Sequence, residues 1–201
     1  MARVALSKSE LARQTRQLKT YERFLPSLDL KRKQLMAERA RARIQLRETE
    51  QRIGALQERV QERLPMLSNR EIDLEGLVRL EAVDLERENL VGVLLPVVGD
   101  VRLSVREYGL LAKPHWVDIL VEELREALGL RVQRDIQRRR VELLEAAVRK
   151  VTQRVNLFDK VLIPRTRKHI DRIRIHLSDA ERAAVVRSKI AKGKRLKQGL
   201  A

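Results

Sequence analysis

The chain has 201 residues, of which 36% are charged and only five are aromatic, and its formal net charge is +16. It contains no cysteine, so disulfides and thiolate metal sites are excluded and a reducing cytoplasm is the natural setting. Few aromatic residues and many aliphatic and charged ones are typical of long helices and coiled coils rather than of an ordinary globular core. The longest apolar run, residues 90–98, has nine residues. A spanning helix needs about 20, so we expect no membrane insertion.

The positive charge is divided unevenly along the chain. Residues 1–64 hold 16 basic and 8 acidic residues, and residues 131–201 hold 21 and 7. Residues 65–130 reverse the balance, with 7 basic and 13 acidic residues. This division predicts that the flanks and the middle contact different partners.

The N-terminal segment, residues 1–64, is predicted to form one long helix. Ser7 and Glu10 make a capping-box pattern at its start, and the pair Leu64-Pro65 ends it. Apolar residues then recur at alternating steps of three and four, as in a coiled-coil seam. The residues assigned to this seam are Leu18, Leu25, Leu28, Leu35, Leu46, Ile53, Leu56 and Val60.

Four residues disturb this first helix, and one of them, Gly54, weakens it slightly. Arg32 and Arg39 occupy seam positions, where their long stems are expected to lie along the apolar surface with the charged ends directed outward. Pro26 removes one backbone hydrogen bond, so we expect a bend in the preceding turn.

The middle segment, residues 65–117, is predicted to contain a short helix and a small β-hairpin. A second capping pattern, Ser68 with Glu71, indicates a helix over about residues 71–88. The period then changes to two at Val101, Leu103 and Val105, which indicates a strand with Arg102, Ser104 and Arg106 outward. Gly99-Asp100 is taken as the turn and residues 90–98 as the opposing strand, with Pro96 restricting it to an edge. A stray apolar loop is the alternative interpretation.

A second long helix is predicted over residues 118–190, followed by a frayed basic tail at 191–201. Its strict seam comprises Val141, Leu144, Val148, Val151, Val155, Phe158 and Leu162. After Pro164 the apolar stripe shifts by one residue, to Ile170 and Ile173, which predicts a change of register at the proline.

Two long seams joined by about 50 residues are expected to form an antiparallel two-helix coiled coil. The predicted fold is therefore dominated by α-helix, as one structural unit with a short helix and a β-hairpin in its connection. Counting from the ends places Pro26 near the level of Pro164. The same count gathers basic residues at the end that holds both termini, and these are Arg13, Arg16, Arg182, Arg187, Lys189 and Lys192.

Residue patterns that carry catalysis are absent from the sequence. There is neither a phosphate-binding GxxxxGK[ST] loop nor a GxGxxG motif. His169 and His176 lie seven residues apart on one predicted helix, but no carboxylate stands at matching spacing, so partly exposed structural histidines are the simpler interpretation. We expect no catalytic, cofactor-binding or metal-binding residue and no cofactor.

Three segments resemble a known family, the D subunits of the V-type/A-type ATP synthases. The first comprises residues 6–11 (LSKSEL) and 28–35 (LDLKRKQL), and the second comprises 88–97 (ENLVGVLLPV) and 108–111 (YGLL). The third and most specific is 154–165 (RVNLFDKVLIPR), followed by 187–192 (RSKIAK). They occur in the family's order and cover nearly the whole chain. Pro26 departs from the family pattern.

The resemblance implies a non-catalytic central-stalk subunit of a rotary ATPase. The helical hairpin would insert its termini into the hexamer of catalytic A and B subunits. Its middle would contact the F subunit and the socket subunit above the membrane ring, on the cytoplasmic side. Rotation would then couple ATP synthesis or hydrolysis to proton or sodium transport.

Two other functions are compatible with the residues alone. A basic coiled coil can bind nucleic acid through its phosphates, although base-reading motifs and stacking aromatics are missing. A scaffold that homodimerises through its seams is the second. The resemblance implies instead a chain that binds no nucleic acid and is not a homo-oligomer.

Overall fold

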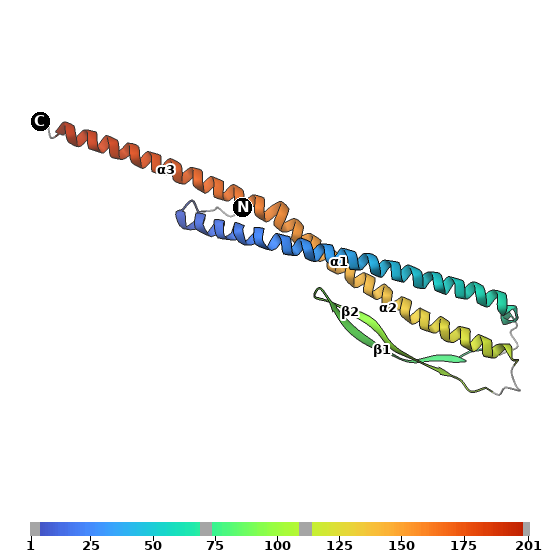
Figure 1. Ribbon diagram of the computed structural model, residues 1–201. Coiled ribbons are helices and arrows are strands. Elements are labelled where there is room, and N and C mark those ends of the chain that lie inside the picture. Colours follow the sequence, from blue (N-terminus) through green and yellow to red (C-terminus); the bar gives the residue numbers. More distant parts are fainter. Residues whose placement is uncertain (1–4, 69–73, 109–113, 199–201) are drawn as a thin grey trace. The chain divides into compact units, whose positions relative to one another are not determined.

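The computed structural model describes residues 5–68, 74–108 and 114–198. They form two long helical arms and a two-stranded antiparallel sheet, which confirms the predicted fold class (Figure 1). By contacts the chain divides into two compact units, Arg32–Lys150 and Met1–Lys31 with Val151–Ala201. The elements in chain order are α1 (Lys8–Arg63), the 3-10 helix η1 (Pro65–Ser68), β1 (Val78–Leu90), β2 (Val93–Val105), α2 (Trp116–Leu157), the π-helix η2 (Phe158–Leu162) and α3 (Ile163–Gln198).

Helix α1 is continuous over 56 residues and includes Pro26. Its start uses half of the predicted capping box, because the backbone N–H of Glu10 donates to Ser7 Oγ at 3.3 Å. It ends at Arg63, and Leu64 and Pro65 follow as the pre-proline rule predicts. The connection continues through η1, and the predicted helix start at Glu71 lies outside the described residues.

The seam residues lie away from solvent along both arms. All fifteen predicted seam positions are buried or half-buried, and none is exposed. The Nε atoms of Arg32 and Arg39 are buried as well, so both stems run along the seam. The buried members are Leu35, Leu56, Leu144, Val148, Val151 and Val155.

The unit Arg32–Lys150 has its apolar core where α1 ends and α2 begins. Leu64, Leu77 and Trp116 belong to a buried cluster. Around it, Tyr108 Oη donates to Asp118 Oδ1 at 2.5 Å, and this hydrogen bond raises the pKa of the Tyr108 hydroxyl. The remaining buried members of the cluster are Val117, Leu120 and Val121. This core anchors both ends of the middle segment.

The β-hairpin is present, but its register differs from the prediction. Residues 78–88 belong to β1 rather than to a helix, and residues 93–105 form the single strand β2. The pairing runs from Val78 opposite Val105 to Leu90 opposite Val93, so Gly99-Asp100 lies inside a strand and is not the turn. The alternation that would have identified β1 is broken by irregularities at Leu80/Ala82 and Val83/Leu85. Without a regular alternation, the acidic residues and the spacing of the leucines in this segment resemble the pattern of an amphipathic helix.

The turn itself is the two-residue link Val91-Gly92. Both residues have positive φ, 51° for Val91 and 78° for Gly92, as a twisted two-residue hairpin turn requires. A β-branched residue at such a φ is strained, at a cost of about 1 to 3 kcal/mol. Hydrogen-bonded and non-hydrogen-bonded pairs alternate from the turn onward, and the pair of Pro96 with Arg87 is a non-hydrogen-bonded one. Proline has no backbone N–H, but at this position the sheet loses no hydrogen bond.

Gly99 is required by a close approach of the two strands. A Cβ at this position would lie 2.9 Å from the backbone carbonyl oxygen of Asp84, and real Cβ atoms do not approach backbone so closely. This glycine therefore marks the irregularity between Val83 and Leu85, not a turn.

In the unit of Met1–Lys31 with Val151–Ala201, a π-helical turn precedes Pro164. The N–H of Ile163 donates to the carbonyl of Phe158, and the ring of Phe158 meets Tyr21 edge-on with centroids 5.4 Å apart. A π turn contains one residue more than an α turn, which accounts for the predicted one-residue shift of the stripe. Downstream the buried face continues with Ile163, Thr166, Ile170 and Ile173.

The ion pair between Glu22 and Arg167 supports the predicted level of the two prolines. Pro26 lies four residues after Glu22 in α1, and residue 163 lies four residues before Arg167 in α3. Because the helices are antiparallel, Pro26 therefore lies near the level of Pro164.

Candidate functional site

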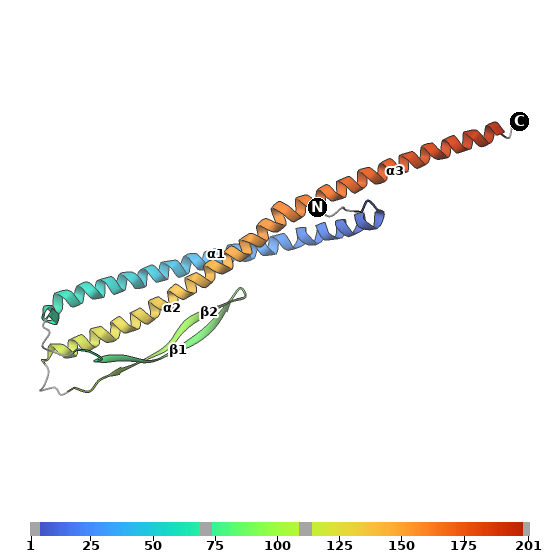
Figure 2. The ribbon, with the colours of Figure 1, turned by 180° about the vertical axis from the view of Figure 1, so that it is seen from behind.

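The distal part of α3 is the most exposed stretch of helix in the chain's described residues. Lys8 Nζ, at the first residue of α1, lies 3.3 Å from Glu181 Oε1. Helix α3 continues to Gln198, which adds 17 residues or about 25 Å beyond this pair. Within the same unit, Figures 1 and 2 show this extension running past the start of α1. The helix therefore extends beyond the predicted end near residue 190.

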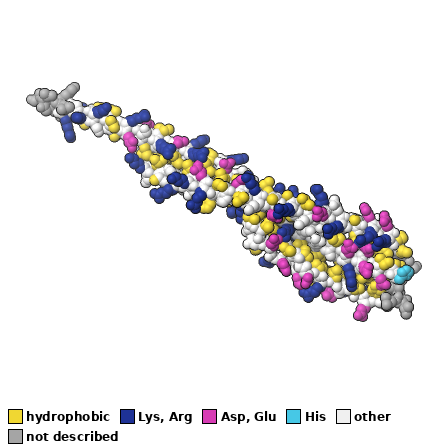
Figure 3. Space-filling view, in the orientation of Figure 1, with side chains coloured by type: hydrophobic (Ala, Val, Ile, Leu, Met, Phe, Trp, Pro, Cys, Tyr) yellow, Lys and Arg dark blue, Asp and Glu magenta, His cyan; other side chains and the backbone are white. Residues whose placement is uncertain are grey.

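Every described side chain from Ser178 to Arg195 is exposed. This stretch, called here the α3 extension, holds six basic and two acidic residues. Val185, Val186 and Ile190 are also more than half exposed. Figure 3 shows basic and apolar side chains intermixed along it. An isolated helix of this length is marginal in water, so such a surface is expected to be covered by a partner.

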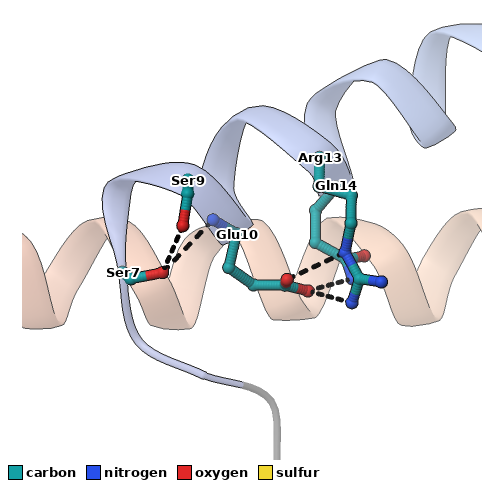
Figure 4. Close-up of polar contacts among 5 residues, drawn as sticks. All are labelled: Ser7, Ser9, Glu10, Arg13 and Gln14. Carbon is teal, nitrogen blue, oxygen red and sulfur yellow. Dashed lines mark hydrogen bonds and ion pairs between the residues drawn. The ribbon is translucent and has the colours of Figure 1, made fainter.

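The start of α1 carries a separate polar cluster (Figure 4). Arg13 donates twice to the Glu10 carboxylate, at 2.8 Å each, and the Gln14 side-chain amide donates to it at 2.8 Å. These bonds lower the pKa of the Glu10 carboxyl, with Arg13 as the main cause. The Glu10 side chain is therefore turned away from Ser7, which explains why only half of the capping box forms.

The structure separates the basic residues that were predicted to gather at one end. Arg13 lines a cavity of about 390 Å³ with Arg165 and His169, far along α3 from Arg187. The start of α1 lies beside Glu181. The predicted basic residues of α3, from Arg182 onward, therefore lie in the α3 extension, past the start of α1. The error arises because chain counting cannot fix where an antiparallel pair begins. Those residues, all exposed, are Arg182, Arg187, Lys189 and Lys192.

The hairpin presents the predicted outward residues in different ways. Arg102 and Arg106 are exposed, whereas Ser104 is half-buried. Arg102 pairs with Asp84 across the strands at 3.0 Å. The hairpin also exposes large apolar side chains, with Leu85 58% and Leu94 59% accessible.

Ion pairs that the sequence did not indicate fasten the unit Arg32–Lys150. Arg59 holds Glu123 at 2.8 Å and Glu126 at 2.5 Å, which links α1 to α2. Arg140 of α2 holds Glu88 of β1 at 2.7 Å and connects the hairpin to the helix. Figures 1 and 2 both show the hairpin running alongside α2. The sequence could not predict these pairs, because it offers 44 basic and 28 acidic residues as possible partners.

Groupings of side chains that could bind a metal are absent from the described ranges 5–68, 74–108 and 114–198. They contain no group of three or more His, Asp and Glu side chains that could hold a metal ion. No helix within them is long and apolar enough to cross a membrane. His115 lies near the start of α2, apart from His169 and His176 on α3. The described residues present three kinds of surface, which are the paired helices, the exposed basic end of α3 and a hairpin with exposed leucines.

Long helices that pack antiparallel along buried apolar seams are the architecture of coiled-coil proteins. The chain belongs to the family of ATP synthase D subunits, whose profile matches residues 10–193. It is 32% identical to the V-type ATP synthase D subunit of Borreliella burgdorferi over 200 residues, 98% of each chain. It is 34% identical to the same subunit of Chlamydia felis over 198 residues, 96% of this chain and 94% of the relative.

Proposed function

We propose that the chain is the central shaft of a rotary V-type ATP synthase. Family membership supports a place in that complex, because its relatives are named as D subunits of V-type ATP synthases. The shaft role is supported by the helical arms: α1 alone has 56 residues, about 85 Å at 1.5 Å per residue. A shaft transmits rotation and has no need of a catalytic site, so the chain acts as a non-catalytic subunit.

The main support for this proposal is the exposure of the α3 extension together with its positive charge. Its exposed side chains carry six positive and two negative charges, and no described residue of its own unit covers them. Basic residues lie all around the helix at 100° per residue, which suits a surrounding sleeve better than a flat partner. We place the extension inside the hexamer of catalytic A and B subunits, where acidic or carbonyl groups would face it as it turns. Rotation would couple ATP synthesis or hydrolysis to proton or sodium movement.

The middle of the chain would contact the partners on the membrane side of the complex. The hairpin belongs to the acidic middle segment, residues 65–130, and exposes Leu94 beside its turn, whereas the α3 extension is basic. Its partners would be the F subunit and the socket subunit of the membrane ring, at the cytoplasmic face.

Deleting the α3 extension from residue 187 onward, together with residues 1–10, tests the placement of the termini. Single surface charges contribute little, so we expect single alanine variants to behave like the wild type. The double truncation should lower ATP-driven ion pumping more than ATP hydrolysis, because the grip on the hexamer is loosened. Equal pumping per ATP hydrolysed by truncated and full-length chains would show that the placement is wrong.

A deletion of residues 78–105 with a short linker tests the middle segment. The helical arms should remain folded by circular dichroism, since the seam residues are untouched. Co-purification with the F subunit or the socket subunit should fall, while co-purification with the catalytic subunits is retained. Unchanged recovery of all subunits would remove the hairpin from the interface.

A further inference from the structure

The tip of the hairpin, residues 90–94 (LVGVL), consists of apolar residues around Gly92 in a chain that is 36% charged. Leu94 is 59% exposed, and Leu90, Val91 and Val93 are half-buried. Two-residue hairpin turns normally carry Asn, Asp or Gly, because both central residues need positive φ. The apolar tip is therefore not what the turn geometry selects.

Val91 shows the conflict most directly. Its φ of 51° lies in the left-handed region, which a β-branched side chain enters only with strain. The polar contact that supports the turn, Gly92 N–H to Asn89 Oδ1 at 2.9 Å, does not involve the Val91 side chain. Asparagine at position 91 would adopt the same backbone with less strain. The geometry of the turn thus gives no reason for a valine here.

We propose that the hairpin tip, residues 90–94, is an apolar plug that enters an apolar pocket on a neighbouring protein subunit. Burial of Val91 and Leu94 in that pocket would offset the strain of the turn. The inference rests on the proposed function only in that the pocket belongs to another subunit of the ATP synthase.

Charge favours a protein pocket over a lipid surface or a second copy of the chain. Behind the tip in β1, Glu86 is followed by Arg87, and Glu88 is ion-paired with Arg140, so this part of the hairpin has no excess of basic residues with which to bind anionic headgroups. A convex tip also offers no pocket to an identical tip. A protein pocket with an apolar floor and a polar rim fits both the apolar tip and the exposed carboxylate of Glu86.

Three variants of the full-length chain test the plug. Val91→Asn suits the turn and is expected to slow amide exchange of the β1 and β2 backbone on the order of tenfold. The same change should weaken binding at least about tenfold, because the tip loses its apolar contact. Leu94→Ser should weaken binding similarly, while Leu85→Ser is the matched control. Leu85 is equally exposed on the same hairpin but away from the tip, and its replacement should leave affinity unchanged.

The binding measurement uses fluorescence anisotropy of the labelled chain titrated with the complex assembled from its other subunits. A wild-type chain that does not bind this complex would contradict the proposed function itself. Wild-type binding with no loss in Val91→Asn and Leu94→Ser would contradict the plug alone. Binding to phosphatidylglycerol vesicles that depends on Val91 and Leu94, or a dimer in light scattering that Leu94→Ser disrupts, would assign the tip to lipid or to a second copy and also overturn it.

Discussion

At the scale of single residues, Gly99 and Gly54 make a pair with opposite expectations. A Cβ at position 99 would meet the Asp84 carbonyl oxygen at 2.9 Å, whereas at position 54 it meets nothing within 4 Å. Gly99→Ala should destabilise the hairpin by about 1 to 3 kcal/mol, since the strands must separate. Gly54→Ala should stabilise α1 by about 0.5 to 1 kcal/mol. Amide exchange of β1 and β2 together with urea unfolding measures both, and a harmless Gly99→Ala would show that the strands yield easily.

Glu145 gives a pH dependence whose direction follows from its partner. The guanidinium of Arg43 hydrogen-bonds this carboxylate and lowers its pKa from the usual 4.5. A carboxyl with a lowered pKa in the folded state contributes stability that is present above pH 4.5 and is lost as pH falls through the lowered value. Glu145→Gln should therefore flatten the fall of melting temperature below about pH 4.5. Arg43→Gln should flatten it in the same way, and two profiles parallel to the wild type would contradict the assignment.

At the scale of elements, the seam of the helical pair is tested at Val151. This side chain is 6% exposed, so an aspartate in its place would bury an unpaired carboxylate. We expect Val151→Asp to cost about 3 to 5 kcal/mol of unfolding free energy. Gln153→Asp, two residues away on the exposed side of the same helix, should cost far less. Thermal unfolding followed by circular dichroism compares them, and equal melting temperatures would mean that the seam is not a buried surface.

The π-helical turn shows how one local irregularity controls an element. Pro164 cannot donate to the carbonyl of residue 160, so the regular ladder is interrupted there whatever the neighbouring residues are. The extra residue in Phe158–Leu162 rotates the helix beyond it, and Ile170 and Ile173 stay on the buried face. An unbroken α-helix would have turned this part of the stripe away from α1 by about 100°.

At the scale of the whole molecule, we expect the isolated chain neither to bind nor to hydrolyse ATP. The sequence lacks a phosphate-binding loop, and the described residues contain no group of His, Asp and Glu side chains that could hold a metal ion. Calorimetric titration of ATP into the purified chain should give no saturable heat. The assembled complex, tested in the same buffer, is the positive control for hydrolysis. Tight one-to-one binding by the chain alone would refute the shaft interpretation.

The sequence by itself determined the helical arms and their faces. A strict three-four repeat of aliphatic residues has one stable solution in water, which is burial against a second helix, and Leu35, Leu144 and Val155 are buried accordingly. The one-residue shift beyond Pro164 could be predicted for the same reason. The Leu64-Pro65 end followed from sterics of the backbone alone.

Only the tertiary structure decided the hairpin register and the level at which the arms pair. Residues 78–88 fit a helix or a strand locally, and pairing with β2, together with the ion pair from Arg140 to Glu88, selected the strand. The start of α1 lies beside Glu181. The sequence could not predict this level, because many similar heptads allow several alignments and only the packing summed along the helices favours one of them. When several distant segments could pair equally well by their local sequence, the free energy of the whole fold decides between them. That free energy cannot be evaluated from a short stretch of sequence.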